Sequence, residues 1–220
     1  MILGIYGSSG MGREVRELAI LINSRNFKKK WKEIIFIDDT KEVGSLKGCM
    51  RLPFSEIVNN YKQDELEIVI CVGEPSSKFK IYEKIKRYGY SLCTLIHPDA
   101  EISPSADIGN GVVVRKGTIV SSDSKIGKNV ILQSNVIIGH DAKIGDHCQI
   151  SSFSEIAGNC DVGNEVFVGI GSFIKENTSI GDQVIVSMGS VVMKNINSGD
   201  IVMGNPARLI SKNNEKKVFK

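Results

Sequence analysis

The sequence lacks the marks of several large classes of protein. It contains no apolar run approaching the ~18 residues that a membrane-spanning helix needs, so we expect no membrane segment. The N-terminal stretch MILGIYGSSG reaches glycine before a signal-peptide core could form, which favours a cytoplasmic location. The five cysteines are an odd number, irregularly spaced and without a CxxC pair, so neither a disulfide framework nor a zinc site is expected. A net charge of +3 gives no reason to expect a nucleic-acid partner.

The strongest pattern present is a six-residue repeat in the second half of the chain. Sixteen consecutive positions in steps of six are all Ile, Leu or Val: Ile102, Ile108, Val114, Val120, Ile126, Leu132, Ile138, Ile144, Ile150, Ile156, Val162, Val168, Ile174, Ile180, Val186 and Val192. A period of six fits neither a helix nor a simple hairpin array. It predicts short strands joined by tight turns, each unit sending one aliphatic side chain into a common core, with three units to an 18-residue coil.

This repeat resembles that of the left-handed parallel β-helix built from hexapeptide repeats. We therefore expect residues 96–210 to form such a β-helix and residues 211–220, which are polar and basic, to form a flexible tail. The repeat frame is unbroken, so no external loop interrupts the coils. That continuity counts against the serine and galactoside acetyltransferase subgroups, which typically carry a loop there.

Residues 1–95 show a different pattern. Apolar runs at 2–6, 33–37 and 66–72 alternate with helix-like segments at 13–23 and 77–88, which predicts a small parallel sheet and a Rossmann-like α/β domain. The glycine-rich loop GSSGMG after the first run could bring backbone N–H groups to a phosphate, and Asp38 and Asp39 could bind ribose or base edges. A tight strand-to-helix turn without any ligand is the alternative interpretation of this loop.

The three histidines are the main candidates for chemistry. Their spacing along the coils is too irregular for three zinc ligands on adjacent turns, so no metal is expected. His140 and Asp141 follow the inward Ile138 and fall at or beside a turn, outside the aliphatic core. A histidine beside a carboxylate could act as a general base with an orienting partner, whereas the alternative is a solvated surface histidine.

The order of motifs along the chain resembles one family of sugar acyltransferases. GSSGMG, IDD, CVG, LIHPDA, IIGHDAKIGD, AGN and MGNPAR follow one another across residues 2–210. This order is similar to that of the bacillosamine, perosamine and viosamine pathway N-acetyltransferases and the sialic acid O-acetyltransferases. The resemblance implies a nucleotide-sugar-binding N-terminal domain, homotrimers formed by the β-helix, and acetyl-CoA bound as co-substrate between neighbouring subunits, without a metal.

The resemblance also implies roles for individual residues. His140 matches the general base and Asp141 the acidic residue beside it, while Gly158 matches a glycine whose backbone N–H contacts the thioester carbonyl. Ile170 and Met188 join Gly158 as expected acetyl-CoA contacts. The expected nucleotide-sugar contacts are Gly7, Ser9, Gly10, Gly12, Asp38, Asp39 and Gly73. Met11 and Gln149 occupy positions at which many members have histidine. His147 lies two residues before Gln149 and does not match that family histidine. The roles of Met11, His147 and Gln149 therefore stay open.

The expected activity is acetyl transfer from acetyl-CoA to the amino group of a nucleotide-linked 4-amino-4,6-dideoxy sugar, in the synthesis of a surface polysaccharide or glycan. His140 would accept the amine proton and the Gly158 N–H would stabilise the oxyanion. A sugar O-acetyltransferase of the sialic acid type is the first alternative, because the same base can serve a hydroxyl. A solenoid that binds nucleotide without catalysis is the second.

Overall fold

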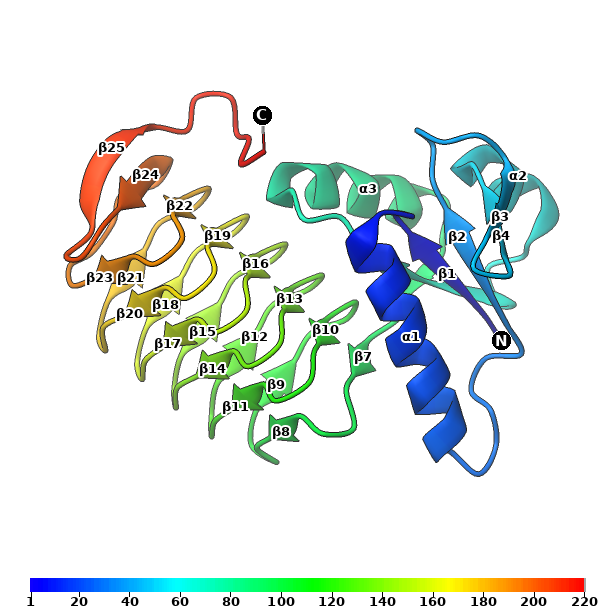
Figure 1. Ribbon diagram of the computed structural model, residues 1–220, viewed down its shortest axis with the longest axis horizontal. Helices are drawn as coiled ribbons and strands as arrows, with labels where there is room; N and C mark the ends of the chain where they lie inside the picture. Colours follow the sequence, from blue (N-terminus) through cyan, green and yellow to red (C-terminus); the bar gives the residue numbers. More distant parts are fainter. Residues whose placement is uncertain (220) are drawn as a thin grey trace.

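The computed structural model describes residues 1–219 and shows an α/β domain followed by a parallel β-helix (Figure 1). In the first domain the strands lie in the order β3-β4-β2-β1-β5-β6. The strands and helices of this domain are β1 (Ile2–Tyr6), α1 (Gly10–Arg25), β2 (Glu33–Ile37), β3 (Gly44–Leu46), β4 (Cys49–Leu52), α2 (Phe54–Asn60), β5 (Leu66–Ile70), α3 (Pro75–Arg87) and β6 (Ser91–Leu92). The expected Rossmann-like arrangement is confirmed.

The sheet is not entirely parallel, because β3 and β4 form an antiparallel hairpin that the sequence analysis does not predict. Lys47 and Gly48, at φ 51° and 76°, make the turn between them. Two successive residues in the left-handed region are typical of a tight hairpin turn. The hairpin strands are short and carry no clear alternation of apolar residues, which explains why the pattern missed them.

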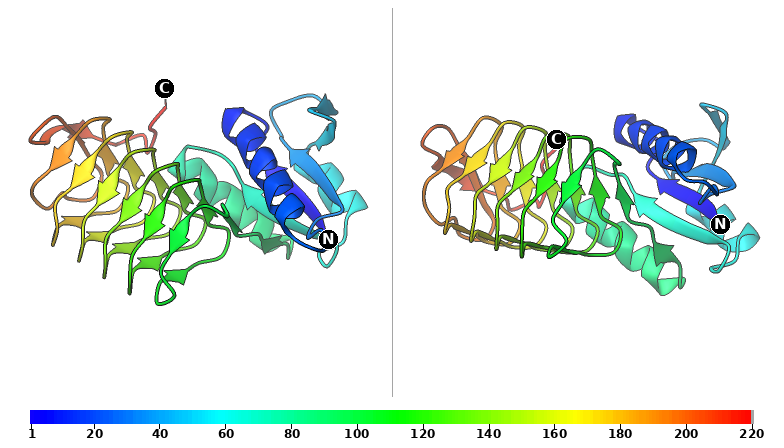
Figure 2. Two further views of the ribbon diagram at one scale, coloured as in Figure 1. Left: turned by 60° about the horizontal axis from the view of Figure 1, so that its bottom comes forward. Right: turned by 90° about the horizontal axis from the view of Figure 1, so that it is seen from below.

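The β-helix consists of short strands on three faces, as the left-handed hexapeptide fold requires (Figure 2). Face 1 contains β7 (Leu95–Ile96), β10 (Val113–Val114), β13 (Ile131–Leu132), β16 (Gln149–Ile150), β19 (Phe167–Val168), β22 (Ile185–Val186), β24 (Asp200–Met203) and β25 (Arg208–Lys212). Face 2 contains β8 (Glu101–Ile102), β11 (Ile119–Val120), β14 (Ile137–Ile138), β17 (Glu155–Ile156), β20 (Phe173–Ile174) and β23 (Val191–Val192). Face 3 contains β9 (Asp107–Ile108), β12 (Lys125–Ile126), β15 (Lys143–Ile144), β18 (Asp161–Val162) and β21 (Ser179–Ile180).

The six-residue repeat has the structural meaning that was expected. Val114 pairs in parallel with Leu132, and Leu132 with Ile150, so each coil takes 18 residues. The aliphatic positions from Val114 to Val192 are buried in one core, while Ile102 and Ile108 in the first coil are only partly buried. One residue in each later turn has positive φ, and several are Asn, Asp or Gly, which tolerate that conformation best.

The two domains meet along face 1. Val15, Leu18 and Ala19 of α1 share a buried cluster with Val113 and Ile131 of the β-helix. Beside it, the fully buried Lys78 of α3 donates a hydrogen bond from Nζ to the backbone oxygen of Cys148, at 2.8 Å. These contacts fix α3 against the coils, so groups on the two domains hold a defined position relative to each other.

The C-terminal residues return toward α3 (Figure 1). Strand β25 pairs antiparallel with β24 and extends to Lys212, past the boundary at residue 210 that the sequence suggests. The N–H groups of Val218 and Phe219 donate to Glu74 Oε2 at 2.8 and 3.2 Å, and the Phe219 ring contacts that of Phe167 edge-on. The segment expected to be a flexible tail therefore forms specific contacts through residue 219, and its mobility stays a prediction.

His147 belongs to the junction between the domains. Its Nδ1 lies 3.0 Å from Asn129 Nδ2, and its ring contacts the rings of Phe79 and Tyr82 on α3. Burial and the nearby Lys78 ammonium lower the pKa of His147 to about 4. Burial likewise lowers the pKa of Lys78 to about 7. Both shifts disfavour the protonated form in the folded protein.

We expect the junction to make stability depend on pH. Between about pH 4 and 6.5 the unfolded chain binds the His147 proton and the folded protein does not, so stability falls as the pH is lowered through that window. From pH 7 to pH 5 the loss amounts to about 2 kcal/mol. Chemical denaturation at the two pH values measures it. The control is His147→Asn, because Asn fits the left-handed turn, as at Asn159, and retains an acceptor for Asn129. An unchanged pH dependence in that variant would contradict the assignment.

Candidate functional site

His140 and Asp141 lie in the turn between β14 and β15, at the corner where face 2 meets face 3. His140 Nδ1 is 2.9 Å from Asp141 Oδ2, and the two side chains are 63% and 54% exposed. Asp141 occupies the left-handed turn position, with φ 57°. The pairing is compatible with a proton on Nδ1, which leaves the Nε2 lone pair available to a substrate proton.

Gly158 lies directly beneath the His140 ring, one coil further along. A Cβ atom at this position would come within 2.8 Å of both Cε1 and Nε2 of the imidazole, so only glycine leaves the ring in place. The Asn159 N–H donates to the His140 backbone oxygen at 2.9 Å, which ties the two turns together. Within residues 1–219 the Gly158 N–H donates no hydrogen bond. A base and an unoccupied N–H donor therefore lie side by side at this corner.

A groove of about 670 Å³ runs along the other edge of face 2. Ile170 and Met188, both exposed, line it at the corner where face 1 meets face 2. Its remaining walls come from the coils, the first domain and the C-terminal segment: Met11, Gly73, Gln133, Gln149, Ser151, Ser152, Phe167, Gly169, Ile185, Ser187, Met203, Val218 and Phe219. Within one chain, then, His140 and Gly158 occupy a different corner from Ile170 and Met188.

A second cavity, of about 470 Å³, lies at the carboxyl ends of β1 and β2. Gly7, Ser9, Asp38 and Asp39 line it, together with residues that the sequence analysis did not select: Tyr6, Ser8, Thr40, Lys41, Val72, Ser77, Lys80 and Ile81. This is the position at which open α/β sheets bind ligands. The position of Ser77 and Lys80 in the first turns of α3, just after the CVG motif, is the signal that could have identified them.

The other predicted glycines have structural roles or lie elsewhere. A Cβ at Gly12 would come 1.9 Å from the Gly7 backbone oxygen, so glycine lets α1 begin against the β1 loop. Gly10 begins α1 and does not line the cavity, and Gly73 lines the groove instead. Their assignment to a nucleotide sugar stays a prediction.

Asp38 and Asp39 are already engaged by the protein. Asp38 accepts hydrogen bonds from the N–H and hydroxyl groups of Ser8 and Thr40. Partial burial raises the pKa of Asp38, but these hydrogen bonds outweigh burial and hold it below its usual value. Asp39 accepts from the Phe54 N–H and from Lys84 Nζ, both at 2.7 Å, and from the Tyr6 hydroxyl. Both carboxylates thus shape the cavity, a role that residue type alone does not reveal.

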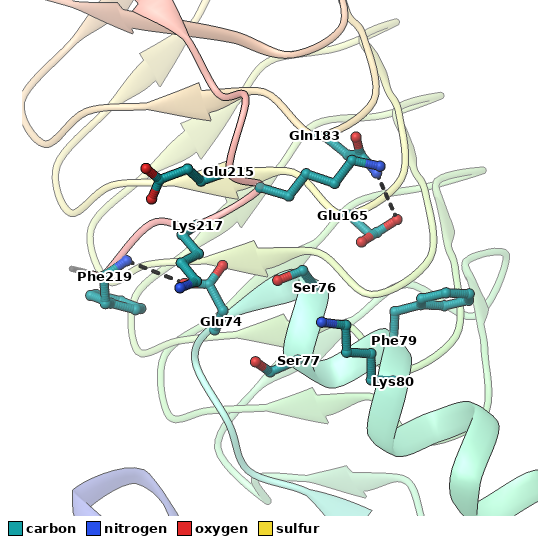
Figure 3. A pocket seen from close by; sticks show the side chains of 11 residues that line it. Glu74, Ser76, Ser77, Phe79, Lys80, Glu165, Gln183, Glu215, Lys217 and Phe219 are labelled. Carbon is teal, nitrogen blue, oxygen red and sulfur yellow. Dashed lines mark hydrogen bonds between the residues drawn. The ribbon is translucent and has the colours of Figure 1, made fainter.

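A third cavity, of about 520 Å³, connects these regions (Figure 3). Ser77 and Lys80 line both this cavity and the one beside Asp38, and Phe219 lines both this cavity and the groove. Figure 3 shows the hydrogen bond from Gln183 to Glu165 on the β-helix side, with Ser76, Ser77 and Lys80 on α3. The three hollows therefore follow one another along the junction of the domains.

Two further observations concern metals and membranes. Among residues 1–219, no group of three or more His, Cys, Asp or Glu side chains is placed to hold a metal ion. In the same range, no helix has the length and apolar character to cross a membrane.

Comparison with known protein families gives two matches. Residues 3–85 match the model described as the PglD N-terminal domain. Residues 123–158 match the bacterial transferase hexapeptide model of six repeats. The two matches fall on the α/β domain and on the β-helix, respectively.

Several solved structures are similar to nearly the whole chain. The acetyltransferase domain of PglB from Neisseria gonorrhoeae FA1090, whose complex with acetyl coenzyme A is also known, is 31% identical with a TM-score of 0.88, covering 95% of this chain and 99% of that one. WeeI from Acinetobacter baumannii AYE is 28% identical with a TM-score of 0.88, covering 96% and 100%. PerB from Caulobacter crescentus, in complex with CoA and GDP-perosamine, is 25% identical with a TM-score of 0.85, covering 96% and 98%.

Proposed function

The chain belongs to the hexapeptide-repeat sugar acyltransferase family and is an acyltransferase, and from this premise we propose that it transfers the acetyl group of acetyl-CoA to an amino sugar. The proposed acceptor is a nucleotide-linked 4-amino-4,6-dideoxy sugar destined for a surface polysaccharide or glycan, and the proposed location is the cytoplasm. The observation that carries the proposal is the His140–Asp141 pair placed over the Gly158 N–H. Similar chains bind acetyl-CoA, or CoA with GDP-perosamine, which supports the choice of substrates.

In the proposed mechanism the sugar amine attacks the thioester carbonyl, so a C–N bond forms and the C–S bond breaks. His140 Nε2 takes the proton that the nitrogen loses, and the CoA thiolate leaves. Asp141 holds the Nδ1 proton and stabilises the imidazolium. The Gly158 N–H donates to the oxyanion of the tetrahedral intermediate, an interaction worth about 3–4 kcal/mol in other enzymes.

We also propose that the active site forms between copies of this chain in a homotrimer. The three outer faces of the β-helix differ in chemistry: face 1 contacts the first domain, and face 3 presents Asp107, Lys125, Lys143, Asp161 and Ser179. Face 2 presents Ile119, Ile137, Phe173 and Val191, of which Ile137 and Phe173 are exposed, together with Glu101 and Glu155 in the same column. Burying its four apolar side chains against another copy is favourable, and the two carboxylates would need a polar partner or water at that interface. The two corners that hold the groove and His140 are the two edges of face 2.

The test of the proposed function is thiol release from acetyl-CoA by the purified protein. The acceptors are UDP-, dTDP- and GDP-linked 4-amino-4,6-dideoxy sugars and their hydroxyl counterparts. We expect turnover with one amino sugar, and the nucleotide preferred would identify the acceptor. Turnover only with hydroxyl acceptors would replace the proposal by O-acetylation, and no turnover across the set would contradict it.

A further inference from the structure

Residues 213–219, here called the C-terminal strap, run from the end of β25 back to the first domain (Figure 1). Asn213 fixes the start of the strap. Its backbone N–H donates to the Gly199 oxygen at 2.7 Å, and its side-chain amide donates to the Gln183 backbone oxygen at 3.1 Å. Its side-chain oxygen accepts a hydrogen bond from the Lys217 N–H at 3.0 Å. The strap therefore begins at a position that is firmly attached to the β-helix.

The other end of the strap is held by few contacts. The N–H groups of Val218 and Phe219 donate to the same carboxylate oxygen, Oε2 of Glu74 (Figure 3). The Phe219 ring meets the Phe167 ring edge-on, yet Phe219 is 58% exposed. Hydrogen bonds at an exposed position compete with water, so little free energy opposes their release. A firmly attached base and a weakly held end are the geometry of a hinged flap.

The weakly held end lies between the two proposed substrate sites. Phe219 lines both the groove and the third cavity, and Ser77 and Lys80 line both the third cavity and the cavity of the first domain. A Cβ atom at Gly73 would come within 3.4 Å of Phe219 Cε2 and 3.5 Å of Met11 Cε. The ring therefore fills space between the first domain and face 1, at the point where the groove meets the third cavity.

We propose that the C-terminal strap is an autoinhibitory gate, which has to detach from Glu74 before the two substrates can meet. This inference rests on the proposed function, with acetyl-CoA in the groove beside Ile170 and Met188 and the sugar amine reaching it from the first domain. A site that is open in only a fraction of the molecules binds its ligand with an affinity lowered by that fraction. The strap thus sets the apparent affinity for acetyl-CoA without taking part in the chemistry.

A stop codon after Lys212 removes the strap and leaves β25 complete. We expect the Kd of CoA, measured by isothermal titration, to fall about tenfold and the KM for acetyl-CoA to fall with it, because every molecule is then open. Phe219→Ala removes only the ring and should lower both constants about threefold. The control is Phe27→Ala, which removes a fully exposed ring beyond the end of α1 opposite Met11 and should leave both constants unchanged.

Hydrogen exchange follows the movement itself. In the wild type, CoA should speed the exchange of the Val218 and Phe219 amide protons, which Glu74 protects in the closed position. Glu74→Gln keeps an acceptor but removes the charge that strengthens both hydrogen bonds. Faster exchange of the same two amides is therefore expected in this variant without CoA, together with a Kd for CoA about threefold lower.

The binding and exchange measurements need no turnover, so they separate this inference from the proposed function. Binding of CoA without turnover by the wild type and the shortened chain would contradict the function, while tighter binding by the shortened chain would still support the gate. Unchanged or weaker binding of CoA after truncation would overturn the inference, because the strap would then be irrelevant to the groove or part of its wall. So would slower exchange at Val218 and Phe219 with CoA, which describes a lid closing over the ligand. Phe219→Ala decides the question by the same criteria if the shortened chain does not fold.

Discussion

Replacing His140 by alanine is expected to lower kcat for acetyl transfer by about 10²- to 10⁴-fold, the usual contribution of a positioned general base. The amine becomes cationic as it attacks, and without the imidazole its proton must pass to water. The side chain is 63% exposed and its ring lies over Gly158, which has no side chain to lose contacts, so the variant should fold normally. The KM for acetyl-CoA should change little. Steady-state thiol release with the preferred acceptor measures both quantities.

A matched variant isolates the carboxylate beside the base. Asp141→Asn keeps a residue type that already occupies the equivalent left-handed turn at Asn159 and Asn177, so the backbone should not change. Because Asn still contacts Nδ1 but cannot stabilise the imidazolium, we expect a smaller loss of kcat, about 10- to 100-fold. Activity of His140→Ala within about twofold of the wild type would remove His140 from the mechanism.

Two inactive variants are expected to restore activity when they assemble together. The first is His140→Ala, and the second is Ser187→Trp, which fills the groove with an indole ring. If the base of one copy serves the groove of the next, trimers formed from equal amounts of both variants contain intact sites. In assemblies that contain both variants, about a third of the wild-type activity should return, because one of the three sites in a mixed cyclic trimer takes both of its halves from copies in which those halves are intact.

Co-expression of the two variants with different affinity tags, followed by purification on both tags, yields the mixed assemblies. Each variant purified alone is the control and should remain inactive. A site formed within one chain would give no recovery, because every chain would then carry one defect. Analytical ultracentrifugation of the same samples reports the oligomeric state, and a monomer would contradict the trimer.

The β-helix is predictable from the sequence because its repeat depends only on residues close together in the chain. Each inward aliphatic, from Val114 to Val192, is set by a six-residue count that depends on no distant residue. The same count places His140 and Asp141 in a turn. It cannot show that Asp38 is satisfied by Ser8 and Thr40, since those contacts depend on how two loops meet. Nor does it show that Lys78 is buried against Cys148, 70 residues away.

The candidate site illustrates the same limit. The resemblance selects Ile170 and Met188, and the structure places both in the groove, but their role with acetyl-CoA stays a prediction. That Gln149 Oε1 is buried without a hydrogen-bond partner among residues 1–219 was not foreseeable, because pairing depends on every neighbour of the atom. The path of residues 213–219 toward Glu74 was missed for a related reason, since a polar, basic composition alone indicates no fixed contact.

The 18-residue coil restricts how this chain can change in length. Insertion of a single residue into a strand between His140 and Ile150 would turn the later inward aliphatics away from the core, and the register that pairs Leu132 with Ile150 would be lost. Apart from a loop that leaves the coil at a turn, only the gain or loss of a whole coil preserves both. Each such event would move the groove relative to the base by one strand spacing, about 4.8 Å. The separation between the two halves of the active site can therefore evolve only in discrete steps.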